Sequence, residues 1–293
     1  MDFLSYLIAG TGLGSIYAIM ALGYTMVYGI AKMLNFAHGD IIMVGSYIIF
    51  YAVSNFGINP YVSILISMIL CTILGVLIER VAYRPLRGAA PLAVLITAIG
   101  MSYLLENIAL LSFGADTKAF PDVFNLPAIR LSGGQLVIPG ITVLTIILCV
   151  IIIVGLEFFV NKTKHGQAML AVSEDRDAAT LMGINVNGTI AMTFAIGSGL
   201  AAIAGVLFCS RYQALNPYTG AIPGIKAFTA AVFGGIGSIP GAFIGGLALG
   251  IIESLSGAYI SSELANAIVF AVLIIVLIVK PAGIMGKEVQ EKV

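Results

Sequence analysis

Three polar side chains interrupt an apolar stretch near the start of the sequence, KMLNFAHGDIIMVGSY (32–47). His38 carries an imidazole that titrates near neutral pH, so it is a candidate proton relay or a structural hydrogen-bonding group. Asp40 lies where a helix would begin, which suits either an N-cap or an ion-coupling carboxylate. Asn35 is able to cap backbone groups that a helix break leaves free. Together with Gly39, these residues predict a conformational break at the edge of a translocation route.

A second polar stretch, HGQAMLAVSEDRDAATLMGI (165–184), combines a charge cluster with an apolar face. The cluster comprises Glu174, Asp175, Arg176 and Asp177. The apolar residues recur at helical spacing, and they are Ala171, Val172, Ala178, Ala179, Leu181 and Met182. Because Gly183 ends this pattern, the stretch predicts one short amphipathic helix near 171–183.

A helix of this kind lies on a lipid surface, docks into a partner protein or forms part of a solvated loop. Lipid-surface helices are typically rich in Lys and Arg. The cluster at 174–177 instead carries three acids and one Arg. Its charge therefore favours docking to a protein.

The sequence argues against an enzyme. A zinc hydrolase of the HExxH type needs clustered ligands, whereas the two histidines, His38 and His165, are far apart. The ATP-binding pattern GxxxxGK[ST] is absent from the sequence. Cys71, Cys149 and Cys209 each lie in an apolar run without metal-ligand spacing, so we expect small residues facing the core or lipid. No cofactor or metal is predicted.

Composition indicates which elements must hold these residues. The chain has 293 residues, of which 60% are hydrophobic and 10% charged, with a mean hydropathy of +1.08. Soluble domains are about 45–50% apolar and about 25% charged, so most of this chain must be solvated by lipid. The net charge is zero, which gives no electrostatic case for nucleic acid. The sequence therefore predicts an all-α, polytopic transmembrane bundle forming a single domain over residues 1–293.

A spanning helix needs about 20 mostly apolar residues. Such stretches lie at 4–30, 40–56, 60–79, 91–112, 138–160, 188–210, 241–258 and 263–280. A shorter apolar piece lies at 222–234. These stretches predict about eight or nine membrane segments, some of them discontinuous.

The distribution of Lys and Arg orients these segments, because cytoplasmic connections carry an excess of both. Ten of the 14 basic residues fall on one set of connections: Lys32, Arg80, Arg84, Arg87, Lys162, Lys164, Arg176, Lys280, Lys287 and Lys292. Lys118, Arg130 and Arg211 fall on the other set, and Lys226 lies within the short piece. This predicts the N-terminus outside, the C-terminus in the cytoplasm, and the loop at 161–187 on the cytoplasmic side.

Glu106 and Glu253 fall inside predicted spans. An acid at the centre of a span costs about 2.5–3.5 kcal/mol on insertion scales. Each should therefore face the bundle interior or lie near an interface.

Two short segments match each other, LNFAHG (34–39) and LNPYTG (215–220), and both precede an apolar helical stretch. The first is predicted on the inner side and the second, with Asn216, Pro217 and Gly220, on the outer side. The match is either a chance similarity between two Asn/Gly turns or the trace of an inverted-topology repeat. Repeats of that kind, with broken helices, often build a transport route.

Glycine is concentrated in GGIGSIPGAFIGGLALG (234–250). Small residues let membrane helices approach closely, so this run predicts close packing with a break at Pro240. Gly234 and Gly235 follow the short piece at 222–234, which is typical of a discontinuous helix.

The spacing A-x3-D-x3-A-x3-G-I, formed by Ala171, Asp175, Ala179, Gly183 and Ile184, resembles the coupling loop of bacterial ABC-importer permeases. Four longer stretches look like those of permeases for branched-chain amino acids. They are GYTMVYGIAKMLNFAHGD (23–40), IERVAYRPLRG (78–88), ITAIGMSYLLEN (96–107) and NPYTGAIPGIKAFTAAVFGGIGSIPGAFIGG (216–246). Length and motif order most resemble the H-type subunit, which pairs with a longer M-type subunit.

The resemblance implies a non-enzymatic permease in the bacterial cytoplasmic (inner) membrane that imports leucine, isoleucine and valine. It implies a second permease of the M-type, two ABC ATPase subunits and an extracytoplasmic amino-acid-binding protein as partners. ATP-driven closure of the ATPases would push the helix near 171–183. Permeases for urea and short amides look similar, so those substrates stay open, as does an ion-driven secondary transporter.

Overall fold

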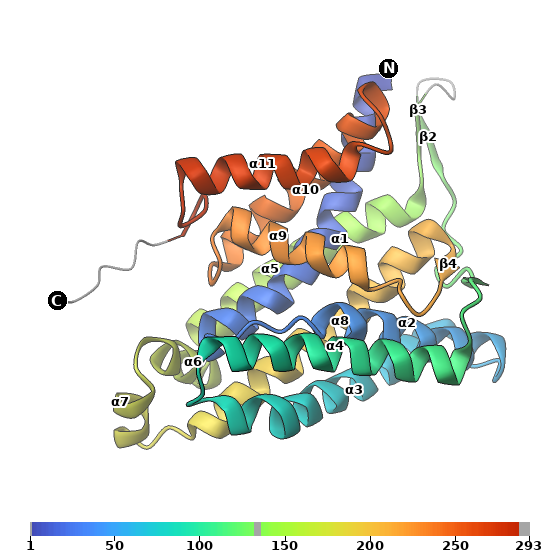
Figure 1. Ribbon diagram of the computed structural model, residues 1–293. Coiled ribbons are helices and arrows are strands. Elements are labelled where there is room, and N and C mark those ends of the chain that lie inside the picture. The colour runs from blue at the N-terminus through green and yellow to red at the C-terminus, as the bar shows by residue number, and fades with distance from the viewer. Residues whose placement is uncertain (1, 132–135, 287–293) are drawn as a thin grey trace.

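The computed structural model describes residues 2–131 and 136–286 (Figure 1). Lys287 and Lys292, which contributed to the predicted orientation, lie outside the described residues. The helices are α1 (Asp2–Ala31), α2 (His38–Ser54), α3 (Pro60–Ile78), α4 (Pro91–Phe113), α5 (Gly140–Lys162), α6 (Lys164–Glu174), α7 (Arg176–Leu181), α8 (Val186–Tyr212), α9 (Ala221–Gly234), α10 (Ile239–Tyr259) and α11 (Ala265–Val279). A π-helical turn, η1 (Glu79–Tyr83), and a 3₁₀ turn, η2 (Arg84–Leu86), extend α3.

Every predicted apolar segment is a helix. Six helices are long and apolar enough to cross a membrane: α1, α3 with its extension, α4, α5, α8 and α10. The helices α2, α9 and α11 are shorter, with 17, 14 and 15 residues. The chain is therefore a polytopic helical membrane protein, as its composition predicts.

Local sequence sets where the helices begin. The side chain of Asn59 accepts a hydrogen bond from Tyr61 N at the start of α3, and Asn185 accepts one from Gly188 N at the start of α8. Pro60 and Pro91 lie in the first turns of α3 and α4, where a missing N–H costs nothing.

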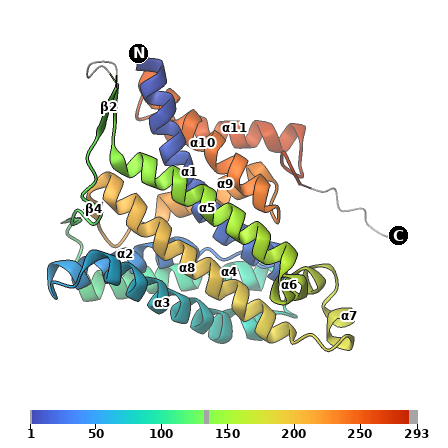
Figure 2. The ribbon, with the colours of Figure 1, turned by 180° about the vertical axis from the view of Figure 1, so that it is seen from behind.

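The helix α1 runs through the bundle between α8 and α10 (Figures 1 and 2). Glycines bring α1 and α10 into backbone contact: a Cβ added at Gly250 would lie 2.1 Å from Gly14 N, and one at Gly246 would lie 2.4 Å from Ala18 N. This is the close packing predicted for the glycine run. In each of α3, α4 and α5, less than a third of the most apolar 18-residue stretch is buried, so these helices lie on the outside of the bundle.

The fold is mostly helical, as predicted, and four short strands lie at one end of the bundle (Figure 1). The strands β2 (Ile129–Leu131) and β3 (Leu136–Ile138) are antiparallel, with Ile129 opposite Ile138. The strands β1 (Lys118–Ala119) and β4 (Ala214–Leu215) form a second antiparallel pair. They occur in the connections before α5 and after α8, where apolar runs end and backbone groups need other partners.

Two breaks divide the helices of the core. Residues 32–37 between α1 and α2 are not helical, yet Met33, Asn35 and Ala37 are buried. Irregular backbone is tolerated at membrane depth only inside protein or facing a cavity. The second break, between α9 and α10, lies at residues 235–238 rather than at Pro240, which belongs to the first turn of α10. Gly235 has a φ of +106°, a conformation that glycine adopts readily.

Candidate functional site

The two matching segments of the sequence meet inside the bundle, at the starts of α2 and α9. A Cβ added at Gly220 would lie 1.9 Å from Gly39 O, and one at Gly39 would lie 2.6 Å from Gly220 O. Gly224, one turn into α9, also approaches Gly39. The two segments therefore touch at the starts of their helices, and that they enter from opposite sides of the membrane stays a prediction.

Neither of these helix starts is capped by a side chain. Asp40 is the third residue of α2 and not its N-cap, so that prediction is wrong. The Asn35 side chain does not use its Oδ1 for capping, because this oxygen accepts a hydrogen bond from Tyr83 Oη at 3.0 Å. The turn before α9 is organised by Asn216, whose Oδ1 accepts a hydrogen bond from Tyr218 N across Pro217.

His38 is buried and points at α1. Its Nε2 lies 3.2 Å from Met20 O, and since a carbonyl only accepts, Nε2 donates. Its ring packs edge-on against Tyr24, with ring centroids 4.6 Å apart. This is the geometry of a side chain that holds α1 against α2.

A pocket of about 190 Å³ opens beside the α2–α9 contact. Its polar lining comes from Asp40 of α2 and from Ser102 and Glu106 of α4. The apolar lining comes from Tyr24, Phe36, Ile99, Tyr103 and Ile225, with backbone of Gly39, Gly220, Ala221 and Gly224. Asp40 is 2% exposed, and its Oδ2 has no hydrogen-bond partner among the described residues. The Asp40 carboxylate interacts with Ser102 of α4, so the pocket is lined by a buried carboxylate with one oxygen left without a hydrogen-bond partner.

A second interior acid, Glu253 of α10, is fully engaged. Its Oε1 accepts a hydrogen bond from Lys226 Nζ of α9 at 2.7 Å, and its Oε2 accepts one from Tyr17 Oη of α1 at 3.0 Å. Lys226 Nζ also donates to Tyr17 Oη at 3.3 Å. Glu253 thus faces the bundle interior, one of its two predicted positions. Its partners were not predicted, although opposite charges within apolar helices typically pair.

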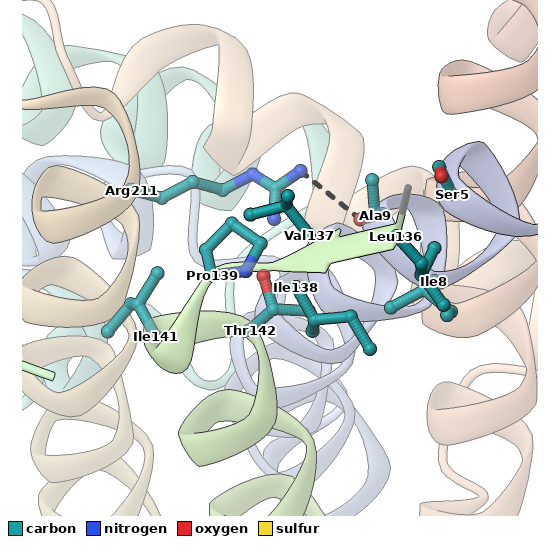
Figure 3. Close-up of a pocket in the computed structure, with 10 residues that line it drawn as sticks. All are labelled: Ser5, Ile8, Ala9, Leu136, Val137, Ile138, Pro139, Ile141, Thr142 and Arg211. Atoms are coloured by element: carbon teal, nitrogen blue, oxygen red, sulfur yellow. Dashed lines mark hydrogen bonds between the residues drawn. The ribbon is translucent and has the colours of Figure 1, made fainter. Parts of the chain in front are cut away.

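A larger pocket, of about 260 Å³, lies between the N-terminal part of α1, β3 and the start of α5 (Figure 3). Arg211 at the end of α8 lies at this pocket, and its Nη2 donates to Ala9 O of α1 at 3.1 Å (Figure 3). The lining of this pocket is otherwise mostly apolar. Because the guanidinium is held by α1, this pocket offers less unpaired polar chemistry than the one at Asp40.

The prediction of one helix near 171–183 is wrong, because α6 and α7 are separate helices that meet at Asp175. The Asp175 carboxylate caps α7 by accepting hydrogen bonds from Asp177 N and Ala178 N. An Asp that bonds its own downstream backbone interrupts a helix, which explains the division. Of the predicted apolar face, Ala179 is buried, whereas Leu181 and Met182 are 88% and 82% exposed. Gly183 follows with a φ of +82°.

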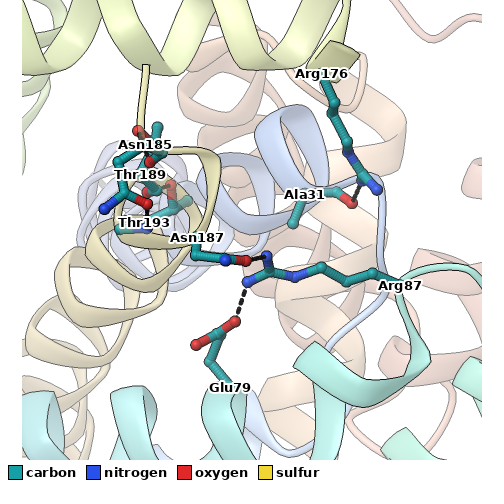
Figure 4. A network of polar contacts seen from close by, with 9 residues as sticks. Ala31, Glu79, Arg87, Arg176, Asn185, Asn187, Thr189 and Thr193 are labelled. Atoms are coloured by element: carbon teal, nitrogen blue, oxygen red, sulfur yellow. Dashed lines mark hydrogen bonds and ion pairs between the residues drawn. The ribbon is translucent and has the colours of Figure 1, made fainter. Parts of the chain in front are cut away.

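Two arginines connect the α6–α7 loop and its neighbours to the bundle (Figure 4). Arg176 donates to Ala31 O, the last residue of α1, directly before the break at 32–37. Arg87 donates to Glu79 of η1 and to Asn187 in the first turn of α8. Burial lowers the pKa of the Arg87 guanidinium, and the Glu79 carboxylate opposes that shift. This network was not predicted, and its signal in the sequence is two arginines and a Glu beside the ends of predicted spans.

The remaining predicted residues are dispersed. Ala171 and Glu174 lie in the last turn of α6, and Gly234 and Gly235 lie at the end of α9. Ile284 N and Met285 N donate to Phe233 O and Gly234 O, so the chain after α11 satisfies the end of α9. The three cysteines are buried and free, and the described part of the chain contains no group of three or more His, Cys, Asp or Glu that could hold a metal.

Comparison with known proteins assigns the family. A family described as "Branched-chain amino acid transport system / permease component" matches residues 6–277. The chain is 44% identical to the high-affinity branched-chain amino acid transport system permease proteins LivH of Escherichia coli (strain K12) and of Salmonella typhimurium, over 99% of this chain and 98% of each relative. It is 43% identical to the permease protein BraD of Pseudomonas aeruginosa, with the same coverage. The chain therefore belongs to the permease components of branched-chain amino acid transport systems.

Proposed function

We propose that this protein is the permease subunit of an ATP-driven importer that moves leucine, isoleucine and valine across the cytoplasmic (inner) membrane. Near-full-length identity of 44% to high-affinity branched-chain amino acid permeases carries this proposal. The chain acts as a single permease domain over residues 1–293, with no catalytic role of its own. It works with a second, M-type permease, two ABC ATPases and an extracytoplasmic binding protein.

The chain crosses the membrane nine times in this proposal, with the N-terminus outside and the C-terminus in the cytoplasm. The six long helices make six crossings, and α11 makes one. The other two combine α2 with the non-helical residues 32–37, and α9 with residues 213–220. The excess of basic residues at the end that carries α6 and α7 supports this orientation.

The loop of α6 and α7 is the proposed contact with an ATPase. The residues assigned to it are Ala171, Glu174, Asp175, Arg176, Asp177, Ala179 and Gly183. Leu181 and Met182 support the proposal, because two large apolar side chains exposed together at a helix end suit insertion into a partner. Arg176 would transmit a movement of α7 to α1 through Ala31 O.

The proposed route passes the two helix starts and the break before α10. The residues assigned to it are Asn35, His38, Gly39, Asp40, Asn216, Pro217, Gly220, Gly234, Gly235 and Pro240. Its support is the buried, non-helical backbone at 32–37 and the backbone contact between Gly39 and Gly220.

Reconstitution tests the transport function. Proteoliposomes would contain this chain with its partner permease and ATPases, with the binding protein added outside. Uptake of labelled leucine that requires ATP is the expected result. Stimulation of ATP hydrolysis only by a binding protein loaded with urea or a short amide would contradict the proposed substrate. Uptake by this chain alone under an ion gradient would contradict ATP coupling.

The ATPase contact needs a variant that spares folding. Asp175→Arg also removes the cap of α7, which costs about 0.5–2 kcal/mol, so Leu181→Gln is the cleaner change. It should reduce the amount of ATPase that co-purifies while leaving the amount of folded permease unchanged. Phe56→Gln is the matched control, since Phe56 is 76% exposed in the loop between α2 and α3. If equal amounts of ATPase co-purify with both variants, α7 is not part of the contact with the ATPase.

A further inference from the structure

The pocket between α2, α4 and α9 has the composition of an amino-acid site. Asp40 supplies a buried carboxylate whose Oδ2 has no hydrogen-bond partner among the described residues, and Glu106 lines the same pocket from α4. A buried carboxylate without a counter-charge is costly, so the site favours a ligand that brings positive charge.

The residues that the structure describes do not supply that positive charge. Among the described residues, the ion pairs are Arg87 with Glu79 and Lys226 with Glu253, so neither Asp40 nor Glu106 has a cationic partner. The adjacent His38 directs Nε2 to Met20 O, away from this role. The acid pair is therefore free to receive a cation from outside the chain.

The rest of the pocket suits an apolar organic cation better than a metal ion. Calcium takes six to eight oxygen ligands, whereas the described residues form no group of three metal ligands. Phe36 lies against Phe228 with ring centroids 5.7 Å apart, which makes a firm apolar wall. Ile99 and Ile225 line the pocket and are partly exposed.

The first turn of α9 completes the set of partners. Ala221 and Gly224 line the pocket, and no side chain caps this helix start. The positive end of a helix dipole favours a carboxylate, as at the broken helices of other transporters. One pocket thus offers negative groups, a helix N-terminus and apolar side chains. Its volume is below the roughly 300–1,000 Å³ of drug-sized sites, in keeping with a single amino acid.

We propose that this pocket binds the transported amino acid within the membrane, with the substrate ammonium group between Asp40 and Glu106. The substrate side chain contacts Phe36, Ile99 and Ile225, and its carboxylate faces the first turn of α9. This inference rests on the proposed function for the identity of the substrate. The permease itself, in addition to the binding protein, would then recognise the ammonium group of the substrate.

Protection of an introduced thiol tests the site without the binding protein. Ser102→Cys places a thiol in the pocket, and the native cysteines are buried. The complete complex of permeases and ATPases is placed in nanodiscs of phosphatidylcholine and phosphatidylglycerol, which lack primary amines. The rate of alkylation by N-ethylmaleimide is then measured with and without leucine. Leucine at ten times its dissociation constant should slow alkylation about tenfold, since about one site in eleven stays empty.

Two leucine analogues show which group of the substrate the pocket recognises. Isopentylamine keeps the ammonium group and the branched chain, and it should protect the thiol. Isocaproate keeps the carboxylate and the branched chain but lacks the ammonium group, and it should protect much less. Equal protection by both analogues would overturn the assignment of Asp40 and Glu106.

Variants of the acids provide the second arm. Asp40→Asn combined with Ser102→Cys should abolish protection by leucine, whereas Glu157→Gln on α5, outside the pocket, should preserve it. Leu104→Cys, on α4 but outside the pocket, should show no protection in any background. Should Ser102→Cys prove unstable, Ile225→Cys reports on the same pocket from α9.

The outcomes separate the site from the function. Uptake of leucine by the wild-type importer without protection of the thiol would overturn the site and leave the function standing. Protection without uptake would support the site and contradict the importer. Adding phosphatidylethanolamine tests the other source of a primary ammonium group. Protection by that lipid alone, with no further effect of leucine, would mean that the pocket holds a lipid headgroup, which overturns the proposal.

Discussion

Two sites in the bundle interior carry acidic side chains, and they differ in what surrounds the acid. Glu253 receives hydrogen bonds from Lys226 and Tyr17, so three helices are joined by one satisfied cluster. Asp40 borders a pocket, and its Oδ2 has no hydrogen-bond partner in the part of the chain that the structure describes. A buried charge with its partners in place holds helices together, whereas one without them has a place for a ligand. Stability should therefore depend on the first site and transport on the second.

The largest expected effect is on the satisfied cluster. Glu253→Ala leaves Lys226 buried without its counter-charge, which should lower the free energy of unfolding by about 3–5 kcal/mol. The fraction of detergent-solubilised protein that stays monodisperse after heating measures this. The double variant with Met at both Lys226 and Glu253 should recover most of the loss. Equal instability of the single and double variants would show that charge pairing is not the cause.

The second largest effect is expected at the contact between Gly39 and Gly220, beside Asp40. Gly220→Ala adds a Cβ that would clash with Gly39 O, and overpacking of this kind should cost about 1–3 kcal/mol and lower uptake. Gly100→Ala on α4 is the matched control, because a Cβ there meets no atom within 4 Å. Thermal stability and leucine uptake of the two variants are compared. Wild-type behaviour of Gly220→Ala would mean that the two helix starts separate readily.

Asp40→Asn should act in the opposite direction to Glu253→Ala. It removes a charge that no described cation compensates, so the free energy of unfolding should be unchanged or rise by about 1 kcal/mol. Leucine uptake should nevertheless fall. Heating of the detergent-solubilised variant beside Glu253→Ala provides the comparison. A stability loss as large as that of Glu253→Ala would show that Asp40, like Glu253, stabilises the fold.

The smallest change in stability is expected at the hydrogen bond between Arg176 of α7 and the end of α1, which directly precedes the break at 32–37. Arg176→Gln weakens the hydrogen bond to Ala31 O, and the free energy of unfolding should change by about 1 kcal/mol or less. The ratio of leucine imported to ATP hydrolysed should fall. Arg130→Gln, which changes a basic residue in β2, is the control. An unaltered ratio in Arg176→Gln would exclude this contact from coupling.

The sequence predicted the helices well because the length of an apolar run is a direct physical requirement for spanning lipid. It also located the breaks at 34–39 and 215–220, since Asn, Pro and Gly compete with helical backbone bonding. It could not bring these segments together, because spacing along a chain gives no distance between distant elements. Their contact depends on the packing of α1, α2, α8 and α9 as a whole.

The site was predicted less completely. Helical periodicity predicted one helix through Asp175, because it registers apolar spacing and ignores a side chain that bonds its own backbone. Asp40 was singled out, but its interpretation as a cap used only its position near a helix start. Its unpaired oxygen is a property of the folded environment. Lys226 and Glu253 were each noted, and only the structure pairs them.

The contact of Gly39 with Gly220 also has a mechanical meaning. Two backbones that touch without interlocking side chains resist compression at the point of contact, but they lose little packing when one helix rotates against the other. The crossing can thus serve as a pivot. Rotation of α2 about it would change the position of Asp40 relative to α4.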